Sequence, residues 1–244
     1  MVLGQPGWRS DLEAGVAIAR SVDPGAKPFV QLYKYACAIE NGALRPTASD
    51  VAQAAESLEV AQRSGNNTAV TYALMIRATT LIHSDSEKGA GLEFLVKASE
   101  LIVNQQLTMT LRRMSDIEFA RERARSGDID GAIDLATTAL AEQIDTGEMI
   151  FRGPATTVLV EALLSRGSAA DIEDAERAID RLAKVPTEPG FVLHELPVLR
   201  LQALLARAHG DEPGYQQFLQ RFRAKAQEAD FEGCLAQADA MAGD

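Results

Sequence analysis

The fold of this chain is decided by one stretch, RSGDIDGAIDLATTAL, which runs from Arg125 to Leu140. Gly127 can adopt the left-handed backbone conformation that ends a helix, and Asp128 can accept hydrogen bonds from the free amides of the next helix. Within that next helix, apolar residues share one face at i, i+1, i+4, i+7 and i+8, and these are Ala132, Ile133, Ala136, Ala139 and Leu140. The stretch therefore predicts two helices that join at a tight turn and pack closely through alanine.

The same arrangement recurs along the chain at a nearly constant spacing. The first helix of each predicted pair ends at Gly42, Ser84, Gly127, Gly167 and Gly210, which lie 42, 43, 40 and 43 residues apart. Inside the second helices, small residues seven positions apart recur as Ala54/Ala61, Gly91/Ala98 and Ala132/Ala139, with Ala175/Leu182 as a degraded version.

This period indicates the class of fold. It exceeds the tetratricopeptide length of about 34 residues and lies within the roughly 40–47 residues of larger helical repeats. Helix pairs of this kind cannot bury their apolar faces alone, so stacking them builds a solenoid with a concave groove. We therefore predict an all-α, tetratricopeptide-like solenoid of helical hairpins, a right-handed superhelix of about 11–12 helices. A compact helical bundle is the alternative, but a bundle would not need a fixed period.

The chain is expected to have three parts. Residues 1–9 form a flexible lead-in or the cut edge of a larger protein, residues 10–231 form the tetratricopeptide-like repeat array, and residues 232–244 form a C-terminal capping helix. All nine prolines are expected in turns or in first helical turns, where a missing amide costs nothing. No stretch shows the period-two alternation of a β-strand.

Proline and glycine also mark the connections between helices. Turns are expected at Pro24–Gly25, at Asp85–Glu87 and, as the clearest linker, from Pro186 to Gly190. The helix after that linker is expected to begin at Glu195–Pro197. It is apolar on most faces, so we expect it to be the most buried helix.

Composition narrows the possible partners. The formal charge of −11 argues against binding to nucleic acid, which requires a basic surface, and against an anionic membrane surface. No apolar run approaches the roughly 18 residues that span a bilayer, and Met1 to Trp8 lacks the features of a secretion signal. Cys37 and Cys234 lie far apart in helical patterns and are expected to be packed thiols in a reducing cytoplasm.

A search for catalytic motifs finds none. The sequence holds no phosphate-binding glycine loop, no C-x-x-C or H-E-x-x-H motif, and no nucleophile at a telling distance from a base. We therefore expect no catalytic residue, no cofactor and no metal. His83 and His209 are expected to interact with the carbonyl ends of their helices. The pair His194–Glu195 could carry acid–base chemistry, but capping of a helix start is the favoured interpretation.

Other charged residues are expected on solvated helix faces. Asp171 and its acidic neighbours crowd the first turn of one helix, where the helix dipole favours them. If first helices line the concave side of the array, four residues are candidates for a binding groove, although each also fits ordinary surface: Arg77, Arg113, Arg152 and His194.

Four runs of sequence carry a family resemblance. They are ARERARSGDIDGAI at 120–133, RGPATT at 152–157, PGFVLHELP at 189–197 and ALLARAHGD at 203–211. They resemble the C-terminal region of actinobacterial, especially mycobacterial, multidomain regulators, in which a class III adenylate cyclase domain and an AAA/STAND-type ATPase precede a long tetratricopeptide-like tail. The likeness covers most of the chain, best from Gly89 to the end, although Cys234 stands where we would expect histidine.

This resemblance implies a role without implying a reaction. The family's metal-binding aspartates and phosphate-binding loop lie in upstream domains, so no catalytic residue carries over, and the chain would be an excised tail or a short relative. The first hypothesis is a regulatory module whose groove holds a protein or peptide partner, such as an upstream ATPase or cyclase domain. The alternatives are a sensor whose groove encloses a small ligand and, remotely, part of a cyclase whose activity lies in other domains. The partner, the binding face and the oligomeric state stay open.

Overall fold

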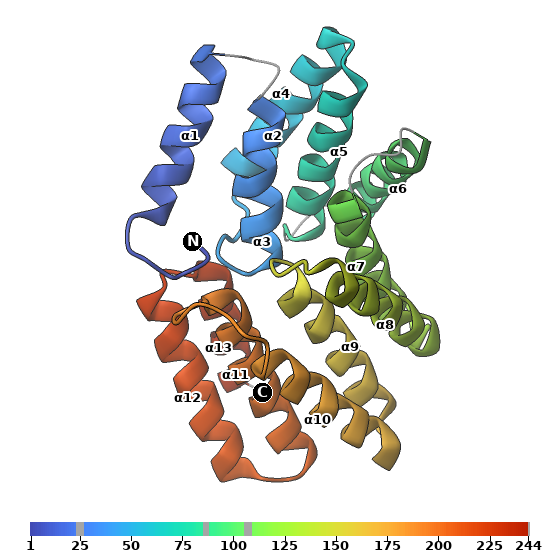
Figure 1. Ribbon diagram of the computed structural model, residues 1–244, viewed down its shortest axis with the longest axis vertical. Helices are drawn as coiled ribbons and strands as arrows, with labels where there is room; N and C mark the ends of the chain where they lie inside the picture. The colour runs from blue at the N-terminus through green and yellow to red at the C-terminus, as the bar shows by residue number, and fades with distance from the viewer. Residues whose placement is uncertain (23–26, 85–87, 105–108, 244) are drawn as a thin grey trace. The chain divides into compact units, whose positions relative to one another are not determined.

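The computed structural model describes residues 1–22, 27–84, 88–104 and 109–243, and these residues form helices with no β-strand among them (Figure 1). The predicted turns at Pro24–Gly25 and Asp85–Glu87 lie outside the described residues. The helices are α1 (Trp8–Val22), α2 (Lys27–Gln31), the π-helical η1 (Leu32–Cys37), α3 (Ala38–Glu40), α4 (Ala48–Ser64), α5 (Asn67–Ile82), α6 (Lys88–Asn104), α7 (Met109–Arg125), α8 (Ile129–Thr146), α9 (Arg152–Arg166), α10 (Ala169–Ala183), α11 (Val192–Ala208), α12 (Glu212–Glu228) and α13 (Glu232–Gly243).

The predicted all-α hairpin architecture is confirmed. Because α2, η1 and α3 follow one another without a break, the described residues make twelve continuous helices, within the expected number. The first helices α3, α5, α7, α9 and α11 each end one or two residues before the predicted positions. The right hand of the superhelix stays a prediction.

The decisive stretch folds as its residues require. Gly127 has a φ of +90°, in the left-handed region that ends α7. Asp128 then caps α8 by accepting a hydrogen bond from the amide of Gly131 at 3.1 Å. Asp211 caps α12 in the same way, accepting from the amide of Gly214 at 3.0 Å. A side chain that satisfies a free amide at a helix start thus fixes where the second helix of a pair begins.

The chain divides into two compact units, with the division inside α7. The first unit comprises Met1 and Pro6–Arg112, and the second comprises Val2–Gln5 and Arg113–Asp244. The residues expected to form a lead-in are therefore divided: Trp8 and Arg9 belong to α1, and the carbonyl of Val2 accepts a hydrogen bond from the amide of Val192 at 3.1 Å.

In the first unit, α5 packs against α4, α6 and the helix formed by α2 and η1. The small residues of the predicted seven-residue pairs lie in this core, with Ala54 and Ala98 fully buried. Gly91 of α6 is required for the contact, because a Cβ atom there would lie 2.8 Å from the main-chain nitrogen of Ile82. The helix pairs therefore approach through small residues, as the sequence predicted.

In the second unit, α9 packs against α8, α10 and α11, and α11 packs against α10 and α12. The helix α9 thus touches both its own second helix, α10, and the next first helix, α11, which is how stacked hairpins bury their faces. Gly153 of α9 allows the closest approach, because a Cβ atom there would lie 2.5 Å from the carbonyl oxygen of Leu193 and 2.8 Å from Cγ of Pro197.

Three expectations about α11 are wrong. The helix begins at Val192, several residues earlier than Glu195–Pro197, so Pro197 lies inside the helix rather than in its first turn. The helix is also not the most buried, because seven of its 17 residues are buried, against eleven of the 16 residues of α5. Part of its apolar surface is instead exposed to solvent.

Two smaller expectations can be compared with the structure directly. Cys37 and Cys234 are both buried thiols, as predicted. Burial raises the pKa of the Cys234 thiol to about 12, and the nearby charge of Arg200 only partly offsets this rise. Among the described residues, no helix has both the length and the apolar character that crossing a bilayer requires.

Candidate functional site

The exposed part of α11 forms one wall of a groove in the second unit. The two helices α11 and α12 are joined by a short turn and run antiparallel side by side (Figure 1). Between them lies an open groove of about 510 Å³. Its walls consist of four residues from each helix: Glu195, Val198, Leu199 and Gln202 from α11, and Arg221, Ala224, Lys225 and Glu228 from α12.

Both walls have the spacing i, i+3, i+4, i+7. Residues at this spacing share one face of an α-helix over two turns. At a rise of 1.5 Å per residue, seven residues make a groove about 10 Å long. The groove is therefore the meeting line of two regular helical stripes rather than an irregular gap.

The floor of the groove is apolar and its rim is charged. Val198 and Leu199 are half-buried, and Ala224 is exposed. Exposed apolar surface bordered by polar groups is typical of a binding surface, because covering it removes apolar area from water.

At one end of the groove, one ammonium group lies between two carboxylates. The Nζ atom of Lys225 lies 3.2 Å from a carboxylate oxygen of Glu195 and 3.5 Å from one of Glu228. Burial lowers the pKa of Lys225, but hydrogen bonds and attraction to the two carboxylates outweigh burial and raise it overall. This end therefore holds two negative charges and one positive charge.

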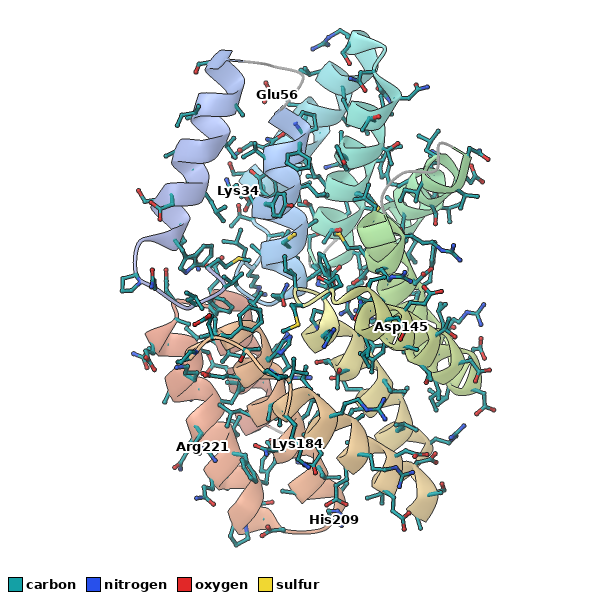
Figure 2. The ribbon with its side chains drawn as sticks, in the orientation of Figure 1. Lys34, Glu56, Asp145, Lys184, His209 and Arg221 are labelled. Atoms are coloured by element: carbon teal, nitrogen blue, oxygen red, sulfur yellow. The ribbon has the colours of Figure 1, made fainter. Side chains whose placement is uncertain are left out.

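At the other end lies an arginine that contacts an aromatic ring. Arg221, labelled in Figure 2, is exposed, and its guanidinium carbon lies 5.6 Å from the centre of the Phe218 ring. Among the described residues, none provides a carboxylate for Arg221. The amide side chain of Gln202 lines the same end of the groove.

Two of the four sequence candidates, Arg152 and His194, meet in the interior of the second unit. Both are buried, with 8% and 4% of their surface exposed. The Nε2 atom of His194 lies 2.8 Å from the carbonyl oxygen of Met149, and its ring packs edge-on against Phe191. Arg152 donates to the carbonyl oxygen of Gln143 at 3.1 Å.

This interior cluster carries unsatisfied polar atoms. In the part of the chain that the structure describes, no hydrogen-bond partner exists for Nδ1 of His194, for Nε of Arg152 or for the side-chain amide of Gln143. Burial lowers the pKa of His194, and the charge of Arg152 lowers it further, against the opposing hydrogen bond to Met149. His194 is therefore held neutral near pH 7.

The expected capping role of His194 and Glu195 is wrong. Both lie in the first turn of α11, but its N-cap residue, Phe191, makes no side-chain capping bond, and the imidazole ring reaches Met149 instead. The expectation of a solvated surface is wrong at Asp171, which is buried. Its carboxylate accepts hydrogen bonds from Arg166 at 2.5 Å and from the hydroxyl of Ser168 at 2.6 Å. These donors hold the pKa of Asp171 well below its usual range.

The other two candidates have structural partners. Arg77, in the first unit, donates to the carbonyl oxygen of Val51 at 2.6 Å and lies beside the ring of Phe94. Arg113, in the second unit, is buried and forms an ion pair with Glu142. These two arginines therefore tie neighbouring helices together.

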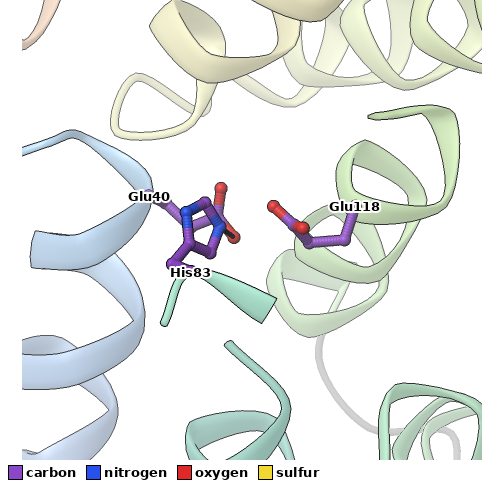
Figure 3. Close-up of side chains that lie close together, drawn as sticks. All are labelled: Glu40, His83 and Glu118. Carbon is purple, nitrogen blue, oxygen red and sulfur yellow. Dashed lines mark ion pairs between the residues drawn. The ribbon is translucent and has the colours of Figure 1, made fainter. Parts of the chain in front are cut away.

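His83 makes a side-chain contact with a carboxylate that sequence reasoning missed. Its amide donates to the carbonyl oxygen of Thr79 at the end of α5, and its Nε2 atom lies 3.6 Å from the carboxylate of Glu40 (Figure 3). Both residues belong to the first unit. Glu118, also drawn in Figure 3, belongs to the second unit and forms an ion pair with Arg121 one turn further along α7.

Comparisons with protein-family models, with curated proteins and with solved structures find no match to this chain. The site therefore has to be interpreted from its own residues. Sequence reasoning missed the groove because it assigned all apolar faces of α11 to the core. The available signal was the i, i+3, i+4, i+7 stripe from Arg221 to Glu228, where three of the four residues facing α11 are charged.

Proposed function

We propose that this chain is a non-catalytic helical-repeat module that binds a segment of another protein in the groove between α11 and α12. The observation that carries the proposal is the apolar floor of that groove, formed by Val198, Leu199 and Ala224 and left open to solvent. Stacked helical hairpins provide preformed surfaces of this kind without chemistry of their own.

The charge pattern of the groove favours a peptide over a catalytic substrate. Lys225 is held by two carboxylates, so its ammonium is fully protonated and is no general base. None of the eight wall residues is a histidine, cysteine, serine or threonine, so the groove offers no common nucleophile of acyl transfer. What the walls offer is apolar area and charge.

The biological setting is proposed from the sequence resemblance alone. In that setting, the chain is a cytoplasmic regulatory tail, or a relative of one, and its partner is an ATPase or cyclase domain of a signalling protein. Any cyclase or ATPase activity then belongs to upstream domains. Incubation of the chain with ATP and Mg²⁺ should yield no cyclic AMP, and measurable cyclic AMP would contradict the proposal.

A display selection tests the interaction itself. Random peptides are selected on the immobilised chain and then measured against a Leu199→Glu variant, whose charge enters the floor of the groove. We expect selected peptides to bind the native chain with micromolar affinity. Their affinity for the variant should be at least tenfold lower, a loss of about 1.4 kcal/mol of binding free energy. Peptides that bind both proteins equally would show that the groove is not the binding surface.

The alternative function is a sensor of a small ligand. The groove volume favours it, because about 510 Å³ lies within the roughly 300–1,000 Å³ of small-molecule sites. A thermal shift screen with a panel of metabolites should then show stabilisation that grows with ligand concentration. The absence of any such shift, together with peptide binding that depends on Leu199, would favour the peptide module.

A further inference from the structure

We infer that the partner is an amphipathic α-helix with an acidic first turn and a basic last turn, bound parallel to α12. This inference rests on the proposed function, since it specifies what the same groove binds. It follows from three properties of the groove: its two-helix walls, an arginine at one end that has no carboxylate partner among the described residues, and the excess negative charge at the other end.

The shape of the groove fits a third helix. Both walls repeat at i, i+3, i+4, i+7, the same spacing that an amphipathic helix uses for its own apolar stripe. A helix laid along two antiparallel helices places its apolar side chains between theirs. An apolar stripe of two turns on the partner would cover Val198, Leu199 and Ala224 together. Helix-in-groove binding of this kind uses anchors at i, i+3, i+4 and i+7.

The end of the groove at Arg221 requires an acidic group. Arg221 is exposed and has no carboxylate partner among the described residues, so N–H donors of its guanidinium are available to a ligand. A glutamate or aspartate on the partner could accept two of these donors, which is the geometry that arginine favours. The amide of Gln202, on the opposite wall, can add a hydrogen bond to the same carboxylate.

The opposite end requires a basic group. Glu195 and Glu228 share the single ammonium of Lys225, at 3.2 and 3.5 Å, and the described residues supply no second cation for the remaining negative charge. A lysine or arginine of the partner beside these glutamates completes two pairs. The contact between Lys225 and Glu195 also establishes which ends of α11 and α12 meet, because it joins the start of α11 to the last turn of α12.

These two requirements set the direction of the partner. Isolated helices favour acidic residues in their first turn and basic residues in their last turn, because of the helix dipole. A helix with this usual polarity places its first turn at Arg221 and its last turn at Glu228. It therefore runs in the same direction as α12 and opposite to α11.

A pair of synthetic helices of identical composition tests the inference. The forward probe has about 14 residues, with leucines at i, i+3, i+4 and i+7, two glutamates in the first turn and two lysines in the last. The reversed probe exchanges the glutamates and lysines. With one fluorophore on each, anisotropy should show the forward probe binding the native chain about tenfold more tightly than the reversed probe.

Variants of the chain show which charge is responsible. The substitution Arg221→Glu should lower the affinity of the forward probe about tenfold and raise the affinity of the reversed probe. The matched control is Arg223→Glu, two residues away on the same helix, where the arginine pairs with Asp239 of α13 outside the groove. That variant makes the same change in net charge and should leave both affinities within about twofold, since salt screens distant surface charges. Far-UV circular dichroism checks that each variant is folded.

The outcomes separate this inference from the proposed function. If both probes bind the native chain equally and the Leu199→Glu variant binds neither, the proposed acidic first turn and basic last turn of the partner are overturned. That result still supports the groove as a peptide site. If neither probe binds the native chain more tightly than it binds the Leu199→Glu variant, the inference of a helical partner is overturned. The peptide selection then decides the proposed function separately. Self-association of the native chain that Leu199→Glu abolishes in sedimentation would make a second copy the occupant, and would overturn the inference as well.

Discussion

The two faces of α11 carry similar apolar residues but differ in how deeply these residues are buried. On one face, Leu193 is fully buried and its carbonyl oxygen nearly touches α9 at Gly153. On the other face, Val198 and Leu199 line the groove and are only partly buried. The opposing residues explain the difference, because a glycine lets two backbones approach, whereas Arg221 and Lys225 carry charges that cannot leave water without cost. Burial of an apolar stripe thus depends on the helix that faces it.

The largest effect is expected from one substitution made on each face. Leu193→Ala removes a fully buried side chain and should cost about 2–5 kcal/mol of unfolding free energy, because it leaves a cavity. Leu199→Ala, on the same helix, should cost less than about 1 kcal/mol, since solvent already reaches that side chain. Urea denaturation followed by far-UV circular dichroism measures both. Equal losses would mean that the two faces are equally buried.

The next effect concerns the glycine that closes the buried face. Gly153→Ala forces a Cβ atom against the carbonyl oxygen of Leu193, and overpacking of this kind should cost about 1–3 kcal/mol. Gly89→Ala is the matched control, because Gly89 also occupies the second position of its helix and has no atom within 4 Å of an added Cβ. The control should be neutral or stabilising by up to about 1 kcal/mol, since alanine favours helix. Equal losses of unfolding free energy in the two variants would mean that Gly153 is not required for the close approach of α9 and α11.

The sequence predicted the hairpins because local chemistry determines them. Gly127 and Asp128 specify a helix end and a helix start through their own backbone preferences and hydrogen bonds, whatever packs around them. Alanine and glycine at the seven-residue spacing likewise indicated where helices approach closely. These features need no knowledge of distant residues.

The candidate site could not be predicted in the same way. Whether Leu199 is buried depends on α12, and whether Arg152 and His194 meet depends on how α9 packs against α11. The start of α11 was misplaced for a related reason. The start was expected at Glu195–Pro197, whereas the helix begins at Val192 and Pro197 is accommodated within it against Gly153. Tertiary contacts thus override a local signal.

A smaller loss of stability is expected from a substitution at the start of α12, which alters neither face of α11. Asp211→Ala removes the cap of α12 and leaves the amide of Gly214 without its acceptor, which should cost about 1 kcal/mol. Because Asp211 lies nearly three turns before Arg221, probe affinity for the groove should not change. Asp180→Ala, which breaks only an exposed pair with Lys184, should cost little by comparison. A loss of probe affinity in Asp211→Ala would show that the groove depends on the end of α12.

The smallest effect is expected from pH and concerns the buried face alone. His194 has a pKa lowered by burial and by Arg152, so below its ordinary value of about 6.5 the unfolded chain binds a proton that the folded chain resists. Stability from this residue is therefore complete above about pH 6.5 and falls as the pH drops below that value. The neighbouring Glu148 has a pKa raised by burial and acts in the opposite direction, so total stability alone is not diagnostic.

A single variant separates the two contributions. His194→Gln keeps a donor for the carbonyl of Met149 but removes the titration, while Glu148 and the other histidines remain. Between about pH 7.5 and 5.5, the native chain should lose more unfolding free energy than the variant does. Parallel pH profiles would mean that His194 does not resist protonation in the folded chain. Since none of the residues that line the groove is a histidine, probe affinity should be the same for the native chain and the variant over this pH range.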